Sequence, residues 1–172
     1  KELLRLYQLI KEGFAKDPKI KDACLEETVK LQSGESESIK LWNQFKDITL
    51  SEADKIYRRL GIDFDLTLGE SFYHDQLGPL VEDLLAKGIA EISDDAVCIF
   101  SNKELDRKDD PLLVSRDGEW VPVPCMIRKN DGGYNYATTD IATIDYRVNE
   151  LKSDKILYIV DDRQSLHFRQ LF

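Results

Sequence analysis

The sequence has few cysteines and histidines, and their scarcity excludes several classes of protein. Its three cysteines lie far apart and form no Cys-x-x-Cys pair, so neither a disulfide framework nor a zinc ribbon is indicated. Its two histidines, His74 and His167, have no cysteine or carboxylate at the spacing of a metal site. We therefore expect no metal centre in this chain.

Long apolar runs and an excess of basic charge are also lacking. No run approaches membrane-spanning length and no charged-then-apolar leader opens the chain, so we expect a soluble, cytoplasmic protein without a membrane partner. With 33 acidic against 24 basic residues the net charge is -9, which does not favour a phosphate backbone. DNA is therefore not an expected partner, and a cationic ligand suits the chain better.

Several common motifs of enzymes are absent. The chain has no Gly-x-Gly-x-x-Gly sequence at a strand-to-helix turn and no phosphate-binding Gly-x-x-x-x-Gly-Lys-Ser/Thr loop. Neither Ser115 nor Ser165 has a histidine and an aspartate in a recognisable nucleophile context, which disfavours hydrolysis. No residue of this chain is therefore predicted to be catalytic.

Helical spacing of apolar residues dominates the first sixty residues. The spacing predicts four helices, over 1–14, over 20–31, from Ser38, and from Thr49 to Leu60, with Gly61 ending the last. Alternation from Ile62 to Leu66 then predicts a strand.

The rest of the chain mixes strand and helix patterns. We expect a helix opened by Gly78-Pro79 and four short strands at 89–92, 96–100, 112–115 and 125–128. The last forty residues predict a strand at 134–136, a helix over about 140–151 and an apolar strand at 156–160. Strand, helix and buried strand in this order indicate a βαβ unit of a parallel sheet.

Polar residues follow both strands of this predicted unit. Ligands of open parallel sheets sit beyond the carboxyl ends of the strands, which brings Tyr136 and Asp140 to the same edge as Gln164. With Thr138 or Thr139 as helix cap, Asp140 falls in the first turn, where the helix dipole favours an ionised carboxylate. A carboxylate beside an aromatic ring suits a guanidinium. The alternative is that Asp140 only stabilises its helix and Tyr136 only packs.

The sequence resembles the arginyl-tRNA synthetase family. The resemblance is carried by Lys129–Ala142, Tyr146-Arg147, Ile156–Val160 and Asp162–Phe168. Upstream segments agree in order and spacing, namely Leu31–Glu35, Leu41-Trp42, Tyr57–Leu60, Phe64-Asp65 and Gly69–Tyr73.

The resemblance implies a class I aminoacyl-tRNA synthetase of the α/β class, with a Rossmann-like catalytic domain that carries a helical N-terminal segment and a small α+β insertion. Its expected parts are a helical segment leading into a strand (1–74), the insertion (75–130) and a second-half Rossmann-like βαβ segment (131–172). Such an enzyme, an arginine-tRNA ligase of protein biosynthesis, activates arginine with ATP and Mg and transfers it to tRNA.

The resemblance also implies roles for four residues. Tyr136 and Asp140 match positions that recognise the arginine side chain, Gln164 matches a polar position of the same pocket, and His167 is expected beside the adenylate.

Two ATP signatures of the class, of the His-x-Gly-His and Lys-Met-Ser-Lys-Ser types, do not occur in the sequence. We therefore expect a fragment of a longer ligase that is inactive alone and binds no ATP or Mg by itself. The alternative is a non-catalytic arginine-binding or scaffold module.

Overall fold

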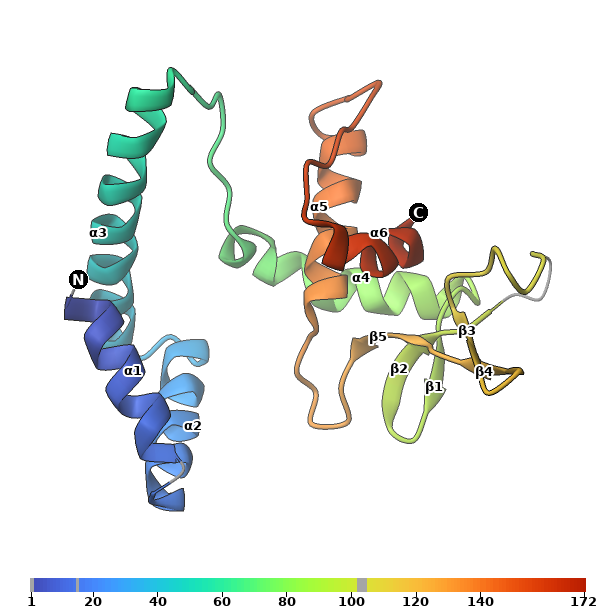
Figure 1. Ribbon diagram of the computed structural model, residues 1–172, viewed down its shortest axis with the longest axis horizontal. Helices are drawn as coiled ribbons and strands as arrows, with labels where there is room; N and C mark the ends of the chain where they lie inside the picture. The colour runs from blue at the N-terminus through green and yellow to red at the C-terminus, as the bar shows by residue number, and fades with distance from the viewer. Residues whose placement is uncertain (1, 15, 102–104) are drawn as a thin grey trace. The chain divides into compact units, whose positions relative to one another are not determined.

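The computed structural model describes residues 2–14, 16–101 and 105–172 of the chain (Figure 1). These residues form two compact units, 1–66 and 67–172. In the described residues, no helix has both the length and the apolar character needed to cross a bilayer. The division into three parts at 74 and 130 stays a prediction.

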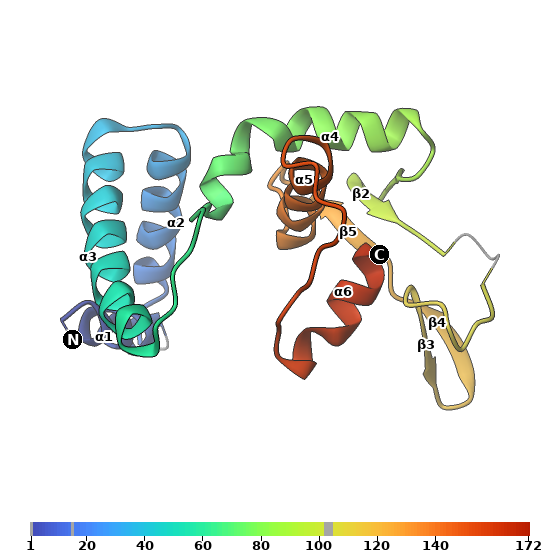
Figure 2. The same cartoon turned by 90° about the horizontal axis from the view of Figure 1, so that it is seen from above.

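The first unit consists of three helices, α1 (Glu2–Phe14), α2 (Pro18–Gln32) and α3 (Ser36–Leu60). Within this unit α2 and α3 run side by side (Figure 2). The predicted helices are confirmed, except that the last two form one continuous helix, α3. Lys1, at the start of the first predicted helix, lies outside the described residues. Thr49 does not cap a new helix, because its hydroxyl donates a 2.8 Å hydrogen bond back to the carbonyl of Phe45.

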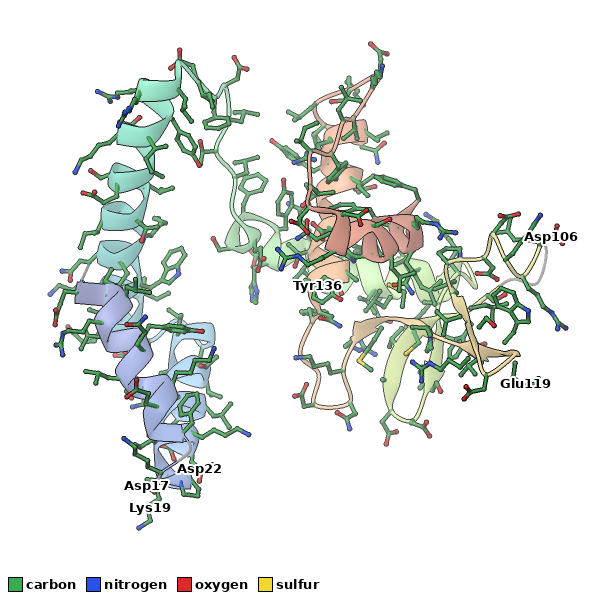
Figure 3. All side chains as sticks on the ribbon, viewed as in Figure 1. Asp17, Lys19, Asp22, Asp106, Glu119 and Tyr136 are labelled. Carbon is green, nitrogen blue, oxygen red and sulfur yellow. The ribbon has the colours of Figure 1, made fainter. Side chains whose placement is uncertain are left out.

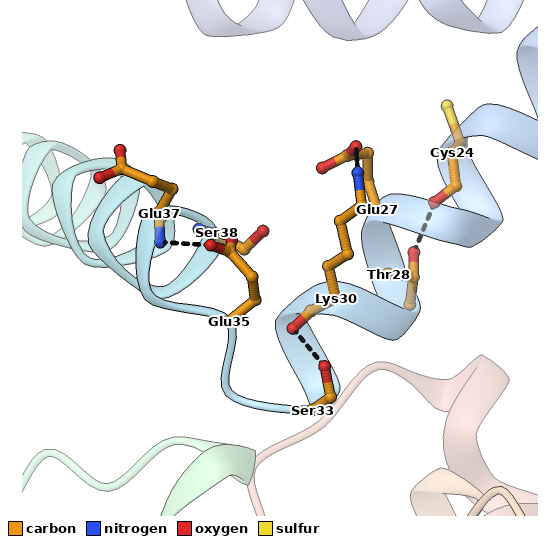
Figure 4. A network of polar contacts seen from close by, with 8 residues as sticks. All are labelled: Cys24, Glu27, Thr28, Lys30, Ser33, Glu35, Glu37 and Ser38. Atoms are coloured by element: carbon orange, nitrogen blue, oxygen red, sulfur yellow. Dashed lines mark hydrogen bonds and ion pairs between the residues drawn. The ribbon is translucent and has the colours of Figure 1, made fainter.

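Acidic side chains begin two of these helices. The carboxylate of Asp17 accepts a 3.0 Å hydrogen bond from the backbone N–H of Lys19, and Pro18 occupies the first turn of α2. The carboxylate of Glu35 accepts from the N–H groups of Ser38 and Glu37, at 2.8 and 3.1 Å (Figure 4). These backbone donors hold the pKa of Glu35 below its usual value.

The segment after α3 departs from the predicted strand. Gly61 ends the helix with φ of +66°, a left-handed conformation that glycine adopts without steric cost. Residues 62–66 form no strand in the described structure. The ring of Phe64 instead packs edge-on against Tyr57, with centroids 4.8 Å apart, so the segment folds back on α3. The predicted strand is therefore wrong.

The second unit contains a three-stranded antiparallel sheet and a separate hairpin. The sheet has the order β1 (Glu91–Ser93), β2 (Ala96–Ile99), β5 (Cys125–Arg128), and the hairpin consists of β3 (Leu113–Arg116) and β4 (Glu119–Pro122). The four predicted strands are confirmed with small shifts of their ends. Strand β4 was not predicted, although the Asp117-Gly118 turn that joins it to β3 is a strong hairpin signal.

Helix α4 (His74–Ala86) covers this sheet and follows directly from the short 3-10 helix η1 (Glu70–Tyr73). The helix begins at His74 and contains Pro79, so the prediction that Gly78-Pro79 opens it is wrong. The core lies between α4, the sheet and helix α5 (Tyr136–Asn149). Its buried members are Val81, Leu84, Ala90, Val97, Cys125, Ile127 and Ala137.

All three cysteines are free thiols. Cys98 and Cys125 are buried in neighbouring strands of the sheet, and burial raises the pKa of both thiols.

The last forty residues fold differently from the predicted parallel unit. Tyr134 makes only an isolated antiparallel bridge with Arg128, and Tyr136 already belongs to α5. Residues 156–160 form no strand in the described structure, and Ile159 is 94% exposed. A strand exists only through hydrogen bonds to a neighbour, and no described strand lies beside this segment. A 3-10 turn, η2 (Asp162–Gln164), and helix α6 (Ser165–Leu171) complete the chain.

Candidate functional site

Tyr136 and Asp140 lie on one face of α5, one helical turn apart. The side chain of Asn135 caps the helix with a 3.0 Å hydrogen bond from the N–H of Tyr136. Neither threonine is therefore the cap, and Asp140 lies beyond the first turn, which corrects the sequence-based placement. Tyr136, labelled in Figure 3, is 60% exposed. The Asp140 side chain is 32% exposed, so both are open to a ligand.

Helix α6 brings His167 to the same face. Its Nε2 lies 2.6 Å from Oδ2 of Asp140, and its side chain is only 14% exposed. The imidazole ring packs edge-on against Tyr136 and Phe168, with centroid distances of 4.8 and 4.9 Å. The carboxylate is thus held from one side and remains partly open on the other.

Of the two threonines between Tyr136 and Asp140, Thr138 fastens α5 to the sheet. Thr138 is fully buried, and its hydroxyl donates a hydrogen bond to the carbonyl of Ile127 in β5. The hydroxyl of Thr143 donates at 2.8 Å to the carbonyl of Thr139. The second bond lies within α5, so the buried Thr138 hydroxyl is the contact that fixes the start of the helix against the sheet, and with it the positions of Tyr136 and Asp140.

Side chains at the end of α6 hold it against the loops around the hairpin. Arg169 donates a 3.0 Å hydrogen bond to the carbonyl of Asp109. Gln170 donates 3.1 Å hydrogen bonds to the carbonyls of Pro111 and Val123. These contacts keep His167 in place over α5.

Gln164 lies one turn before His167 and is exposed. Among the described contacts, none joins its side chain to Tyr136 or Asp140. The structure thus brings together Tyr136, Asp140 and His167, and leaves Gln164 on the adjoining turn.

Tyr158 is a further residue near this site that sequence reasoning missed. Its ring packs against Phe168 at 4.7 Å and lies under the guanidinium of Arg147 at 5.1 Å. Its hydroxyl is buried and has no hydrogen-bond partner in the described part of the chain. Burial raises the pKa of the Tyr158 phenol, and the charge of Arg147 partly opposes this. The sequence offered only a weak signal, an aromatic residue within an apolar run.

Chemically, the site is a carboxylate beside an exposed aromatic ring. Such a pair favours a planar cation, which can stack on the ring while it donates to the carboxylate. The described residues contain no group of three His, Cys, Asp or Glu side chains that could hold a metal ion. A separate hollow of about 600 Å³ borders α6, but Tyr136, Asp140 and His167 do not line it.

Comparison with known proteins decides the family. The model of the catalytic domain of class I tRNA synthetases, arginyl type, matches residues 1–172. The chain belongs to this family. Membership in the arginyl-tRNA synthetases confirms the resemblance seen in the sequence and the expected α/β class.

Curated members of the family support the assignment. The arginine-tRNA ligase of Pseudomonas aeruginosa (strain UCBPP-PA14) is 40% identical over 168 residues, which cover 96% of this chain and 27% of that protein. The ligase of Cellvibrio japonicus is 42% identical over 175 residues, covering 100% and 28%. The chain therefore spans little more than a quarter of the length of the curated relatives it matches.

A solved structure agrees in fold. The crystal structure of arginyl-tRNA synthetase from Plasmodium falciparum superposes with a TM-score of 0.69 at 29% identity. The match covers 90% of this chain and 24% of that one. A mixed helix and sheet architecture is thus shared with an arginyl-tRNA synthetase.

Proposed function

We propose that the chain is part of an arginine-tRNA ligase that activates arginine with ATP and Mg and transfers it to tRNA in the cytoplasm. The family match over the whole chain supports this proposal, as do relatives that are themselves arginine-tRNA ligases. Because the chain corresponds to about a quarter of such a protein, the activity belongs to a longer polypeptide. The scaffold and binding-module alternative has no comparable support.

Within that enzyme, this chain contributes part of the pocket for the arginine side chain. The observation that carries this proposal is the pairing of a partly open carboxylate, Asp140, with the exposed ring of Tyr136 on one face of α5. The guanidinium stacks on Tyr136 and donates to Asp140, while Gln164 contributes a polar group from the neighbouring turn. The place of His167 beside the adenylate stays a prediction.

The chain alone should not form arginyl-adenylate. Attack of the arginine carboxylate on ATP builds charge on the α-phosphate, which synthetases of this class stabilise with groups in their two ATP signatures. Neither signature occurs among the 172 residues. ATP-pyrophosphate exchange by the isolated chain, with arginine and tRNA present, should therefore stay at background. Clear turnover would contradict this assignment of roles.

The pocket itself is tested by calorimetry on a full-length protein that contains the chain. Asp140→Asn keeps the shape of the side chain but removes its charge, and we expect arginine affinity to fall about tenfold to a hundredfold. Asp95→Asn is the matched control, because Asp95 is exposed in the turn between β1 and β2, where asparagine tolerates its positive φ of 63°. Equal affinity in the two variants would refute the pocket.

A further inference from the structure

We propose that His167 is a positioning residue for arginine recognition, whose Nε2–H holds the carboxylate of Asp140 in the orientation that a guanidinium needs. The inference rests on the proposed arginine pocket and adds a residue that acts through Asp140 and not on the ligand directly. The contact that carries it joins α5 and α6 at 2.6 Å, between two residues 27 positions apart in sequence.

Three observations separate this contact from an incidental surface pair. The imidazole is 14% exposed, whereas its carboxylate partner is 32% exposed, so the histidine lies on the protein side of the pair. Tyr136 and Phe168 both pack edge-on against the ring and restrict its rotation. The end of α6 is in turn bonded to the carbonyls of Asp109, Pro111 and Val123. His167 is thus a fixed donor.

The chemistry of the pair determines where the proton lies. An ionised carboxylate is only an acceptor, so the imidazole nitrogen that faces Asp140 must carry hydrogen. In the neutral ring this is the Nε2–H tautomer. In that tautomer the ring donates to Asp140 without adding positive charge beside a cationic ligand, which a lysine or arginine in its place would do.

The bond to His167 leaves acceptor capacity for the ligand. A carboxylate has about four lone-pair sites, and the imidazole takes one of them on Oδ2. Asp140 stays 32% exposed despite this bond and shares the α5 face with the exposed Tyr136. With one oxygen tethered, the carboxylate plane is set before arginine arrives, so less side-chain freedom is lost on binding.

Two substitutions at position 167 separate positioning from packing. His167→Phe keeps an aromatic ring but has no donor, and His167→Gln keeps an N–H donor at the reach of Nε2 but has no ring. In the full-length protein we expect His167→Phe to raise the KM for arginine in pyrophosphate exchange about tenfold with little change in kcat. His167→Gln should restore the KM to within about threefold of the original.

The opposite ranking, with phenylalanine tolerated and glutamine not, would overturn the proposal and assign His167 a packing role. Asp140→Asn in the same assay separates the two proposals. If it leaves the KM for arginine unchanged, the pocket itself is refuted; if it raises the KM while His167→Phe does not, only the positioning role fails.

A measurement of the proton on His167 needs no substitution at position 167. Nitrogen NMR distinguishes the tautomers of neutral imidazole, and His74 is the one other histidine in the sequence. We expect His167 to be the Nε2–H tautomer, and Asp140→Asn to weaken that preference while the tautomer of His74 stays unchanged. An Nδ1–H tautomer in the unaltered chain would overturn the proposal.

Discussion

Asp140 depends on side-chain partners for its orientation, because Asn135 already caps α5 and the dipole of a helix acts mainly within its first turn. The contact that orients it comes from His167, on a different helix. Its neighbour Tyr136 offers a flat face that is held at one edge by the same imidazole. The proposed recognition of a cation at this site therefore rests on a cluster of three side chains.

Thr138 provides a prediction about stability at the same scale. Its buried hydroxyl bonds to the carbonyl of Ile127, so Thr138→Val leaves that acceptor without its side-chain donor. We expect a loss of about 1–3 kcal/mol in the free energy of unfolding. Urea unfolding of the chain measures this loss.

Thr138→Ser is the matched control, because it keeps the hydroxyl and removes only a methyl group. A valine variant that is more stable than the serine variant would show that packing, and not the hydrogen bond, fixes this point of α5.

The sequence could supply some of these residue contacts and not others. Tyr136 and Asp140 are four residues apart, so they share a helix face wherever α5 begins, and their pairing was predictable. The contact between Asp140 and His167 was not, because it depends on how α6 docks, and docking is set by backbone carbonyls of distant loops. The turn that contains Asp140 was also misplaced, since the cap is Asn135 and not a threonine.

At the scale of elements, α2 depends on its cap. The carboxylate of Asp17 accepts the N–H of Lys19, and Asp17→Ala leaves this donor to water (Figure 3). We expect the helix to lose about 1 kcal/mol. Hydrogen exchange of the Lys19 amide should become about fivefold faster, as such an energy implies.

Asp22 provides the control for this helix. It lies in α2 beyond the first turn and is exposed, so Asp22→Ala removes an equal charge without removing a cap. Equal acceleration of exchange in both variants would mean that net charge, and not capping, sets the stability of the helix start.

Helices were predicted more accurately than strands, because three predicted strands, at 62–66, 134–136 and 156–160, are absent from the described structure. The helical spacing of apolar residues in α1, α2 and α3 can be recognised within each segment alone. A strand also requires a neighbouring strand, which the local sequence does not specify. Residues 156–160 have the composition of a buried strand, yet they pair with no described strand. Strand β4 is the opposite case, a short strand that was not predicted although the hairpin turn before it indicates one.

At the scale of the whole molecule, the first unit has little core of its own. No described side chain of α1 or α3 is buried, and five large apolar residues of the unit are at least 60% exposed, namely Leu4, Tyr7, Val29, Ile56 and Leu60. Exposed apolar surface of this kind binds hydrophobic dyes and promotes association. The chain also spans little more than a quarter of its curated relatives.

We therefore expect the isolated chain to bind a hydrophobic dye and to associate as its concentration rises, as measured by fluorescence and sedimentation. Leu60→Lys together with Ile56→Lys should reduce both effects, whereas Arg59→Lys, on the same helix, should reduce neither. Dye binding that is unchanged by the double substitution would show that the dye binds to another apolar surface.

The central claim is that the carboxylate of Asp140 recognises the positive charge of an arginine side chain. A comparison of arginine with citrulline tests it most directly. Citrulline has nearly the same shape but a neutral urea group, so the ratio of the two affinities isolates the charge. In a full-length protein that contains this chain, we predict a preference for arginine that falls at least about tenfold in Asp140→Asn and is unchanged in Asp95→Asn. A preference that survives Asp140→Asn intact would contradict the account.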